Sequence, residues 1–307
     1  MAEPPEPDVT RYGKPAHRRR AGALGGLLVG LAILAAVVWL VVGRDGGGEE
    51  AAPLPPPADT ATLDPPKPVL RIVFPEGFTR KQMAARIAEV NDIAELERGI
   101  VTSLSSKAYL RVTKTMDLLP PGFEAPKAKK LEGFLFPATY DFTEDTTARE
   151  LVEMQLEAFT HAWSKVDLAY ARSKNLTPYD VLIIASMVEE EVQVPKERPL
   201  VVAVIYNRLR GGLPLGIDAT IRYGLNIPPT KAIRQSQLDS SNPYNTRNRL
   251  GLPPTSISNP GLASLQAAAH PADVDFLYFI RKADCKSHFF TASEQEFLDY
   301  PREGLQC

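Results

Sequence analysis

The sequence has few of the residues that build metal sites, and its charge is nearly balanced. Among its 307 residues are two cysteines and four histidines. No pair or cluster of them has the spacing of a zinc site, so the sequence predicts no metal centre. The formal net charge of −2 gives no general attraction to a nucleic-acid backbone. We therefore expect no nucleic-acid partner.

One long hydrophobic run is present, near the N-terminus. Residues 21–43 are 23 consecutive positions without a charge. As a helix they would extend about 34 Å at ~1.5 Å per residue, which is enough to cross a hydrocarbon core of about 30 Å. The apolar region of a cleaved signal peptide is shorter, roughly 7–15 residues. The run therefore predicts a single transmembrane helix rather than a signal peptide.

The residues on either side of this segment predict its orientation. The polar segment 1–20 ends in three arginines, whereas only Arg44 follows the apolar run closely. The positive-inside rule puts the basic tail in the cytoplasm and the chain after residue 44 outside the membrane. Residues 44–68 are rich in glycine, alanine and proline, cannot bury a core, and are expected to form a linker.

The two cysteines, Cys285 and Cys307, would lie on the outer side of the membrane in this orientation. A disulfide is allowed there, and a bridge would tie down the last residue of the chain. The alternative is a pair of free thiols.

The most informative segment is 181–191, which is apolar almost all round and ends in three glutamates. Thr177 suits the N-cap, Pro178 suits the first helical position, and Asp180 completes a pattern like a capping box. A helix without a polar face is a buried helix. At about 100° per residue, Glu189 continues the apolar wall of this helix.

The glutamates at the end of this helix have the surroundings of a general acid. Desolvation, the negative end of the helix dipole and the neighbouring carboxylates all favour the protonated form. A carboxylic acid that holds its proton near neutral pH can protonate a leaving group. On these grounds Glu189 and Glu191 compete for the role. The alternative is that the triplet is an ordinary solvated helix end.

Two folded regions are expected after the linker. Residues 69–130 predict a small strand–helix–helix module and a connector, with its first helix capped by Thr79 and its second over 93–104. Residues 131–307 predict a larger α+β domain around the buried helix. Its further expected elements are a helix that starts at Thr146 or Thr147, helices over 197–210 and 262–269, and a hairpin of 276–280 with 288–291.

Several hydrogen-bonding residues fall on segments rich in glycine and proline, and we expect these segments to be loops. Polar side chains on loops around a rigid scaffold commonly form a binding cleft. Each residue alone is equally consistent with ordinary turn chemistry. The residues are Tyr140, Asp218, Thr220, Tyr244, Asn245 and Thr246.

Blocks of this sequence resemble, in order, the YceG-like family of endolytic murein transglycosylases, over about residues 69–291. The anchor segment and the small first region also resemble those of the family, in which the small region is LysM-like. The matching blocks are 131–140 (LEGFLFPATY), 185–191 (ASMVEEE) with Glu197 and Arg198, 204–209 (VIYNRL), 218–224 (DATIRYG), 244–246 (YNT), 251–254 (GLPP), 259–261 (NPG), 267–271 and Tyr278 with Phe279.

The resemblance implies a function. Members of the family cleave peptidoglycan glycan strands within the chain, and are thought to terminate strand growth near the membrane. The resemblance assigns the catalytic acid to Glu189 and requires no cofactor. It implies the bacterial inner membrane as location, and cell-wall synthases as candidate partners. The residues expected to line the substrate groove are Glu132, Gly133, Tyr140, Asp218, Thr220, Tyr244, Asn245 and Thr246.

Two positions depart from the family pattern. The middle residue of the triplet is usually basic in the family and is Glu190 here. Thr255 and Ser256 stand where a Gly-Pro pair is common. The first departure adds a negative charge beside Glu189, and the second changes one loop of the expected cleft.

Two other functions are compatible with the sequence. One is a membrane-anchored scaffold that binds peptidoglycan without cleaving it. The other is a muramidase, a hydrolase that needs a second carboxylate beside the acid. Asp218 is the carboxylate in the matching blocks that could serve as that second group.

Overall fold

The structure is a computed structural model that describes residues 67–120, 123–125 and 128–301. The expected cytoplasmic tail, the expected transmembrane helix 21–43 and most of the linker 44–68 lie outside the described residues, as does Cys307. These expectations and the Cys285–Cys307 bridge therefore stay predictions. Among the helices that the structure does describe, none is both long and apolar enough to cross a membrane.

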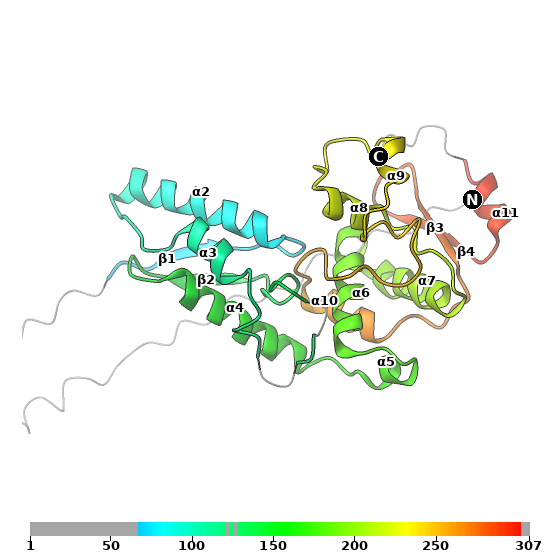
Figure 1. The fold of residues 1–307 in the computed structure, drawn as a ribbon, viewed down its shortest axis with the longest axis horizontal. Helices are drawn as coiled ribbons and strands as arrows, with labels where there is room; N and C mark the ends of the chain where they lie inside the picture. The colour runs from blue at the N-terminus through cyan, green and yellow to red at the C-terminus, as the bar shows by residue number, and fades with distance from the viewer. Residues whose placement is uncertain (1–66, 121–122, 126–127, 302–307) are drawn as a thin grey trace, which may run out of the picture. The chain divides into compact units, whose positions relative to one another are not determined.

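The described elements form what we call a first lobe, residues 67–163, and a second lobe, residues 164–301 (Figure 1). The first lobe consists of β1 (Leu70–Val73), α2 (Arg80–Arg98), α3 (Ser106–Val112), β2 (Thr139–Phe142) and α4 (Ala148–Trp163). The second consists of α5 (Ala169–Ser173), α6 (Pro178–Glu191), η1 (Pro195–Glu197), α7 (Arg198–Arg210), α8 (Asp218–Leu225), α9 (Gln235–Leu238), α10 (Leu262–Ala269), β3 (Tyr278–Arg281), β4 (His288–Thr291) and α11 (Glu294–Asp299).

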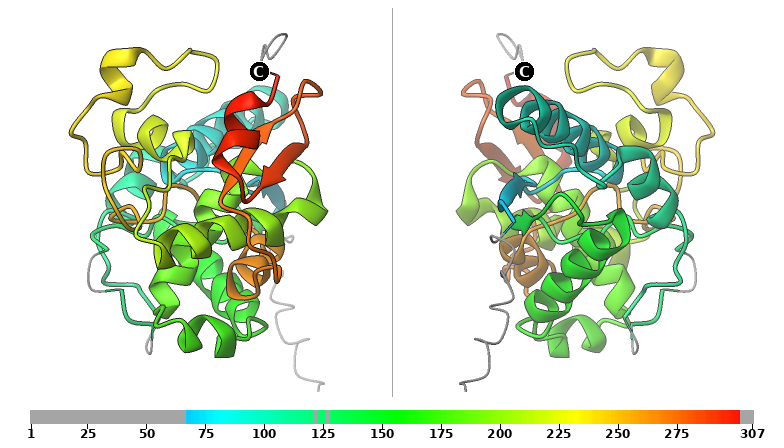
Figure 2. Two further views of the ribbon diagram at one scale, coloured as in Figure 1. Left: turned by 90° about the vertical axis from the view of Figure 1, so that its right-hand side faces the viewer. Right: turned by 90° about the vertical axis from the view of Figure 1, so that its left-hand side faces the viewer.

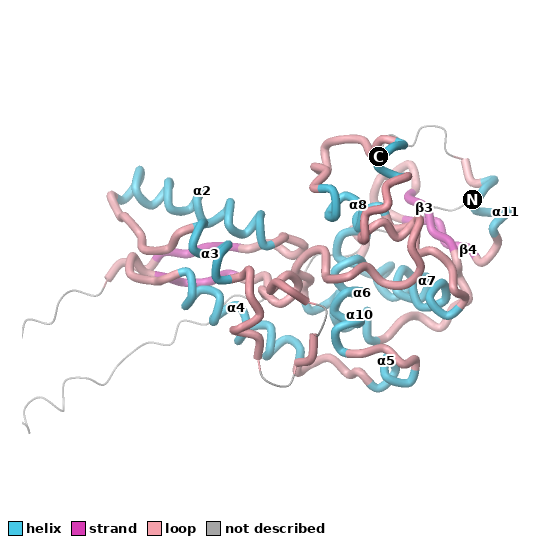
Figure 3. Tube along the Cα trace, in the orientation of Figure 1, coloured by secondary structure: helices cyan, strands magenta, loops and turns pink. Residues whose placement is uncertain are grey.

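The fold is mixed α+β, as expected, with two separate two-stranded sheets (Figure 3). β1 pairs antiparallel with β2, with Leu70 opposite Phe142. The sequence analysis places residues 139–142 in the larger domain, which is expected to start at residue 131. In the structure these residues form β2, which completes the sheet of the first lobe. The expected hairpin of β3 and β4 is confirmed, and α11 packs on it (Figure 2).

Helices α2 and α4 of the first lobe begin where the sequence predicts, but α3, which begins at Ser106, is not predicted. Thr79 caps α2 and Thr147 caps α4, each through a capping box. The prediction of a second helix over 93–104 is wrong, because α2 continues through this region to Arg98. It ends at Gly99, whose φ of 65° lies in the left-handed region that glycine adopts readily.

Helix α6 is the centre of the second lobe. Thr177 and Asp180 form the expected capping box, and Pro178 occupies the first turn. The side chains of 181–188 are all buried, and α6 contacts α7, α8 and α10. Because each large apolar side chain stabilises the fold by about 1.5–3 kcal/mol when fully buried, an apolar helix gains most when other elements surround it. The prediction of a buried central helix is confirmed.

Candidate active site

The three glutamates at the C-terminal end of α6 have three different environments. α6 ends at Glu191, and the backbone N–H of Val192 closes its last turn on the carbonyl of Val188. Three consecutive residues of a helix point in directions about 100° apart. Each carboxyl group therefore meets different neighbours, and each is described separately below.

Glu189 is enclosed by protein and has two partners, a backbone N–H group and an arginine side chain. Its side chain is 6% exposed. The backbone N–H of Gly261, the N-cap of α10, donates to Glu189 Oε2 at 2.9 Å. Arg198 Nη2, at the start of α7, lies 3.7 Å from Glu189 Oε1. Arg198 is itself anchored, because its Nε donates to Ser264 Oγ at 3.0 Å.

Glu190 faces a cleft, and the pKa of its carboxyl group is raised. The residue is exposed at the cleft wall, but its carboxyl group is crowded by surrounding protein. This desolvation raises the pKa of Glu190 to about 7, against a hydrogen bond with the Ser258 side chain that lowers it. The charges of Glu189 and Glu191 raise it further. The carboxyl therefore holds a proton for much of the time at neutral pH.

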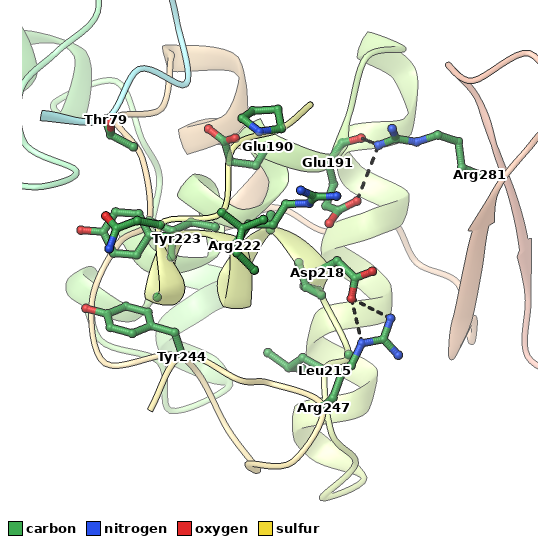
Figure 4. Close-up of a pocket in the computed structure, with 18 of the residues that line it drawn as sticks. Thr79, Glu190, Glu191, Leu215, Asp218, Arg222, Tyr223, Tyr244, Arg247 and Arg281 are labelled. Carbon is green, nitrogen blue, oxygen red and sulfur yellow. Dashed lines mark hydrogen bonds and ion pairs between the residues drawn. The ribbon is translucent and has the colours of Figure 1, made fainter. Parts of the chain in front are cut away.

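Glu191 points toward the hairpin (Figure 4). Its Oε2 lies 3.8 Å from Arg281 Nη2 on β3. Burial raises the pKa of the Glu191 carboxyl, and the positive charge of Arg281 opposes that shift. The charge of Asp218 raises the same pKa. Glu191 is thus a carboxyl held between one cation and one anion.

A cleft of about 1200 Å³ runs past Glu190 and Glu191. Its lining comes from the end of α6, the start of α2, helix α8 and the β3–β4 hairpin. The rings of Tyr223 and Tyr244 meet edge to face on its wall, with centroids 5.2 Å apart (Figure 4). Carboxylates and aromatic rings thus line one large hollow, which is the composition expected of a site for a polar ligand with apolar faces.

Three of the sequence-predicted groove residues line this cleft: Glu132, Asp218 and Tyr244. The Oδ1 of Asp218 accepts a hydrogen bond from Arg247 Nε at 2.7 Å and lies 2.6 Å from Arg247 Nη2. The prediction that Asp218 and Thr220 are on a loop is wrong, because α8 starts at Asp218. A carboxylate in the first turn of a helix is stabilised by the helix dipole, which explains its position there.

Three other predicted groove residues are buried, and their side chains form hydrogen bonds with the backbone of segments around the cleft. Thr220 and Thr246 are 3.0 Å apart through their hydroxyl groups, and both donate to the carbonyl of Ile217. The side chain of Asn245 donates to the carbonyls of Leu238 and Ser240 at 2.8 Å. Their polar atoms are thus paired with protein and do not line the cleft. Their contact with substrate stays a prediction, and in the described structure their side chains bond to the loops beside the cleft.

Gly133 and Tyr140 also lie away from the cleft lining. Tyr140 is on β2, not on a loop, and its hydroxyl donates to the Phe136 carbonyl at 2.7 Å. Gly133 has a φ of 94°, and a side chain there would come within 2.6 Å of Ser256 Cβ. Glycine is needed at 133 for this backbone conformation and close approach, and the predicted contact of Gly133 and Tyr140 with substrate stays a prediction.

A residue that the sequence analysis did not single out connects the site. The side chain of Asn259, fully buried, accepts from the backbone N–H groups of Gly133 and Leu135 at 2.8 and 3.0 Å. It donates to the Phe78 carbonyl at 2.8 Å and to Glu132 Oε1 at 3.0 Å. The signal was its place in the 259–261 block. Two residues further on, Gly261 holds Glu189.

Glu132 is the acidic partner in this network. It is buried, accepts the backbone N–H of Arg80 at 2.7 Å and accepts the hydroxyl of Tyr223 at 3.0 Å. Burial raises the pKa of its carboxyl, and these hydrogen bonds lower it. Glu132 therefore joins the first turn of α2, in the first lobe, to α8, in the second. Among the residues that the structure describes, no group of three or more His, Cys, Asp or Glu is placed to hold a metal ion.

Fold and site together define a mixed α+β protein in which a buried helix carries a cluster of carboxyl groups to the wall of a large cleft. The model of the YceG-like family matches residues 58–303. The chain belongs to the YceG-like family.

Relatives of known name agree with this assignment. An endolytic murein transglycosylase of Bacillus subtilis is 29% identical over 222 residues, which are 70% of this chain and 59% of that protein. An endolytic murein transglycosylase of Streptococcus pneumoniae is 32% identical over 260 residues, which are 78% of this chain and 45% of that protein. The chain thus spans about half the length of these relatives.

A solved structure has the same fold. The crystal structure of a putative yceG-like protein from Listeria monocytogenes superposes with a TM-score of 0.58 at 29% sequence identity. The match covers 74% of this chain and 75% of that one.

Proposed function

We propose that this protein is an endolytic peptidoglycan transglycosylase. It would cleave the β-1,4 bond between N-acetylmuramic acid and N-acetylglucosamine inside a glycan strand. The observation that carries the proposal is the end of a buried helix, where Glu190 and Glu191 line a cleft large enough for sugar rings and Glu189 precedes them, enclosed by protein. Membership of the family and the names of two relatives support the same reaction.

The reaction needs one carboxyl group that acts twice, and we assign it to Glu189. The protonated carboxyl donates to the glycosidic oxygen, which leaves with the N-acetylglucosamine side as the C1–O bond breaks. The resulting carboxylate then takes the proton of the muramic acid C6 hydroxyl, whose oxygen closes on C1. The product end is a 1,6-anhydro sugar, and the acid regains its proton. No water and no second carboxylate are consumed.

The environment of Glu189 suits the second half of this cycle. The Gly261 N–H and the guanidinium of Arg198 stabilise the carboxylate that forms after proton donation. Asp218 and Tyr244, with Tyr223 beside them, would orient the glycan in the cleft. The buried residues Thr220, Asn245 and Thr246 would act by holding that wall in place.

The roles of the remaining parts of the chain are also proposals. Residues 1–20 would be a cytoplasmic tail, 21–43 a single-pass anchor in the bacterial inner membrane, and 44–68 a linker. The strand–helix–helix–strand order of β1, α2, α3 and β2 supports a LysM-like subdomain, completed by β2. The rest of the chain to 307 would form the catalytic domain. Peptidoglycan strands would be the substrate, and cell-wall synthases the protein partners.

The experiment compares three isosteric variants on purified glycan strands. Glu189→Gln should abolish anhydro-ended products, while Glu191→Gln should retain them, with mass spectrometry of the terminal sugar as the readout. Glu190→Gln is the decisive comparison, because Glu190 lines the cleft and its pKa is raised to about 7. Anhydro products that persist in Glu189→Gln but vanish in Glu190→Gln would move the acid to Glu190. Binding of strands without any product from the wild-type chain would favour a scaffold.

A muramidase activity is the second candidate, favoured by one observation. Asp218 lines the same cleft as Glu190 and Glu191, so a second carboxylate is available to activate water. Hydrolysis would leave a reducing end about one water heavier than an anhydro end. If the wild type makes reducing ends and Asp218→Asn does not, the protein is a hydrolase.

A further inference from the structure

We infer that Glu76, in the first lobe, is a positioning residue that controls when Glu189 releases its proton. The inference rests on the proposed function, because it concerns the acid of that reaction. Glu76 lies in the turn Pro75–Gly77 between β1 and α2. None of the sequence blocks that resemble the family's catalytic region contains it. The structure nevertheless brings its carboxyl group to the end of α6.

Backbone hydrogen bonds fix this turn against the second lobe. The N–H of Gly77 donates to the Asn259 carbonyl at 3.0 Å, and the N–H of Asn259 donates to the Phe78 carbonyl at 3.1 Å. Gly77 has a φ of 80°, and a side chain there would lie 3.1 Å from Glu190 Oε1 and 3.7 Å from Glu189 Cγ. The turn therefore covers the side chains of both glutamates at close range.

The carboxyl groups of Glu76 and Glu189 both lie beside Gly261. Its N–H donates to Glu189 Oε2 at 2.9 Å. A Cβ atom built on Gly261 would lie only 1.7 Å from Glu76 Oε1 and 2.2 Å from Glu76 Cδ. Glu76 thus occupies the space of the side chain that residue 261 lacks. One small residue is in contact with both carboxyl groups, which come from different lobes.

One cation acts on both acids. Burial and the charge of Glu189 raise the pKa of the Glu76 carboxyl, and the charge of Arg198 lowers it. Arg198 is also the ion-pair partner of Glu189. The charged groups that face Glu189 are then Glu76 from the turn, Glu190 from α6 and Arg198 from α7. The charge of one guanidinium therefore acts on two carboxyl groups that belong to different elements.

This arrangement makes the two acids a coupled pair. When both are ionised, two negative charges face one positive charge, so each carboxylate makes the loss of the other's proton less favourable. The proton needed for the first half of the reaction is then retained to higher pH. The Glu76 carboxyl takes no part in bond making, and it acts only through Glu189.

The test is the pH profile of anhydro-end formation by the full-length chain on purified glycan strands. Glu76→Gln keeps the size of the side chain but removes its negative charge. We expect the alkaline limb of kcat/KM to move to lower pH by about 0.5–1 unit. Glu76→Asp keeps the charge and should return the limb toward its wild-type position. Glu97→Gln, an exposed glutamate on α2, is the matched control and should leave the profile unchanged.

Two outcomes would overturn the inference. One is an unchanged profile in Glu76→Gln, or a uniform loss of rate at every pH, since a merely structural role would give the latter. The other is an equal shift in Glu76→Asp and Glu76→Gln, because charge would then not be the cause. The proposed function fails separately, if the wild-type chain makes no anhydro ends at any pH.

Discussion

The side chains of Glu189, Glu190 and Glu191 show how far neighbouring residues can differ chemically. Glu189 is tied to Gly261 and Arg198, Glu191 to Arg281, and Glu190 borders the cleft. The helix supplies three directions, and the elements around it supply three environments. The environment of each glutamate at this end of α6 is therefore determined by the residues packed around it, since the three side chains are of the same type.

The raised pKa of Glu190 gives a prediction about stability. Its pKa rises from 4.5 in the unfolded chain to about 7 in the folded one, so the folded state binds the proton more tightly between these values. The free energy of unfolding must then fall as pH rises from about 4.5 to 7. Glu190 is exposed to solvent, so we discount the effect and expect a loss of about 1 kcal/mol.

Urea unfolding at pH 5 and pH 8 checks this expectation. In Glu190→Gln the loss of stability between the two pH values should be smaller than in the wild type by about 1 kcal/mol. Glu157→Gln, an exposed position on α4, should behave as the wild type. A wild type that gains stability relative to Glu190→Gln as pH rises would refute the sign.

At the scale of elements, the turn between β1 and α2 is the segment on which the site depends most directly. Gly77 is in the left-handed region, and its missing side chain leaves room for Glu190. Gly99, at the end of α2, is also left-handed, with φ of 65°, but no atom lies within 4 Å of a side chain built there. Both glycines thus have a left-handed backbone, but only at Gly77 would an added Cβ atom contact neighbouring side chains.

Substituting alanine at each glycine separates these two effects. Gly99→Ala should lose about 1–2 kcal/mol of unfolding free energy from the left-handed backbone alone. Gly77→Ala should lose more, because its Cβ would also press on the Glu190 carboxyl at 3.1 Å. Chemical unfolding gives both numbers. Equal losses of unfolding free energy in the two variants would mean that the turn moves to accommodate the new side chain without a clash with Glu190.

The sequence predicts the elements of this protein well wherever the signal is local. Thr177 marks one helix start correctly, and Thr147 is one of the two starts predicted for another, because a cap depends on residues three positions apart. The sequence predicts a loop where α8 forms, since this helix has only eight residues and no side-chain cap. The pairing of β1 with β2 was not predicted, because strand partners far apart in sequence leave no local pattern.

The site was predictable only in part, for the same reason. The triplet was found from the apolar helix that it ends, and the cleft residues Glu132, Asp218 and Tyr244 from their positions in sequence blocks. Which glutamate faces the cleft could not be found, since the positions of α10 and the β1–α2 turn decide it. Glu76 and Asn259 owe their places to contacts between segments that are distant in the chain.

At the scale of the molecule, the two lobes share hydrogen bonds that neither makes alone. Glu132 links Arg80 to Tyr223, Asn259 holds Phe78, and α10 packs against α4 as well as α6. Separating the lobes would give up these buried or partly buried hydrogen bonds, each worth about 0.5–1.5 kcal/mol, together with the packing of α10 on α4. We therefore expect the described part of the chain to unfold as one cooperative unit.

Tryptophan fluorescence offers a direct check of that cooperativity. The chain has two tryptophans, and Trp163 lies on α4 in the first lobe, stacked on Phe159. In a Trp39→Phe variant, the fluorescence of Trp163 reports on the first lobe alone, whereas far-ultraviolet circular dichroism reports on all helices. The two urea transitions should coincide. Separate midpoints would show that the lobes unfold independently.

The fit of the Glu76 carboxyl into the space beside Gly261 also bears on how the sequence can drift over time. An alanine at 261 would collide with the acid at 76, so a lineage that keeps the acid is constrained to keep the glycine. A glycine at 261 constrains position 76 less, because a residue shorter than glutamate at 76 would leave room for glycine or alanine at 261. Substitutions at these two distant positions should therefore be correlated among relatives, with the change at 76 arising first.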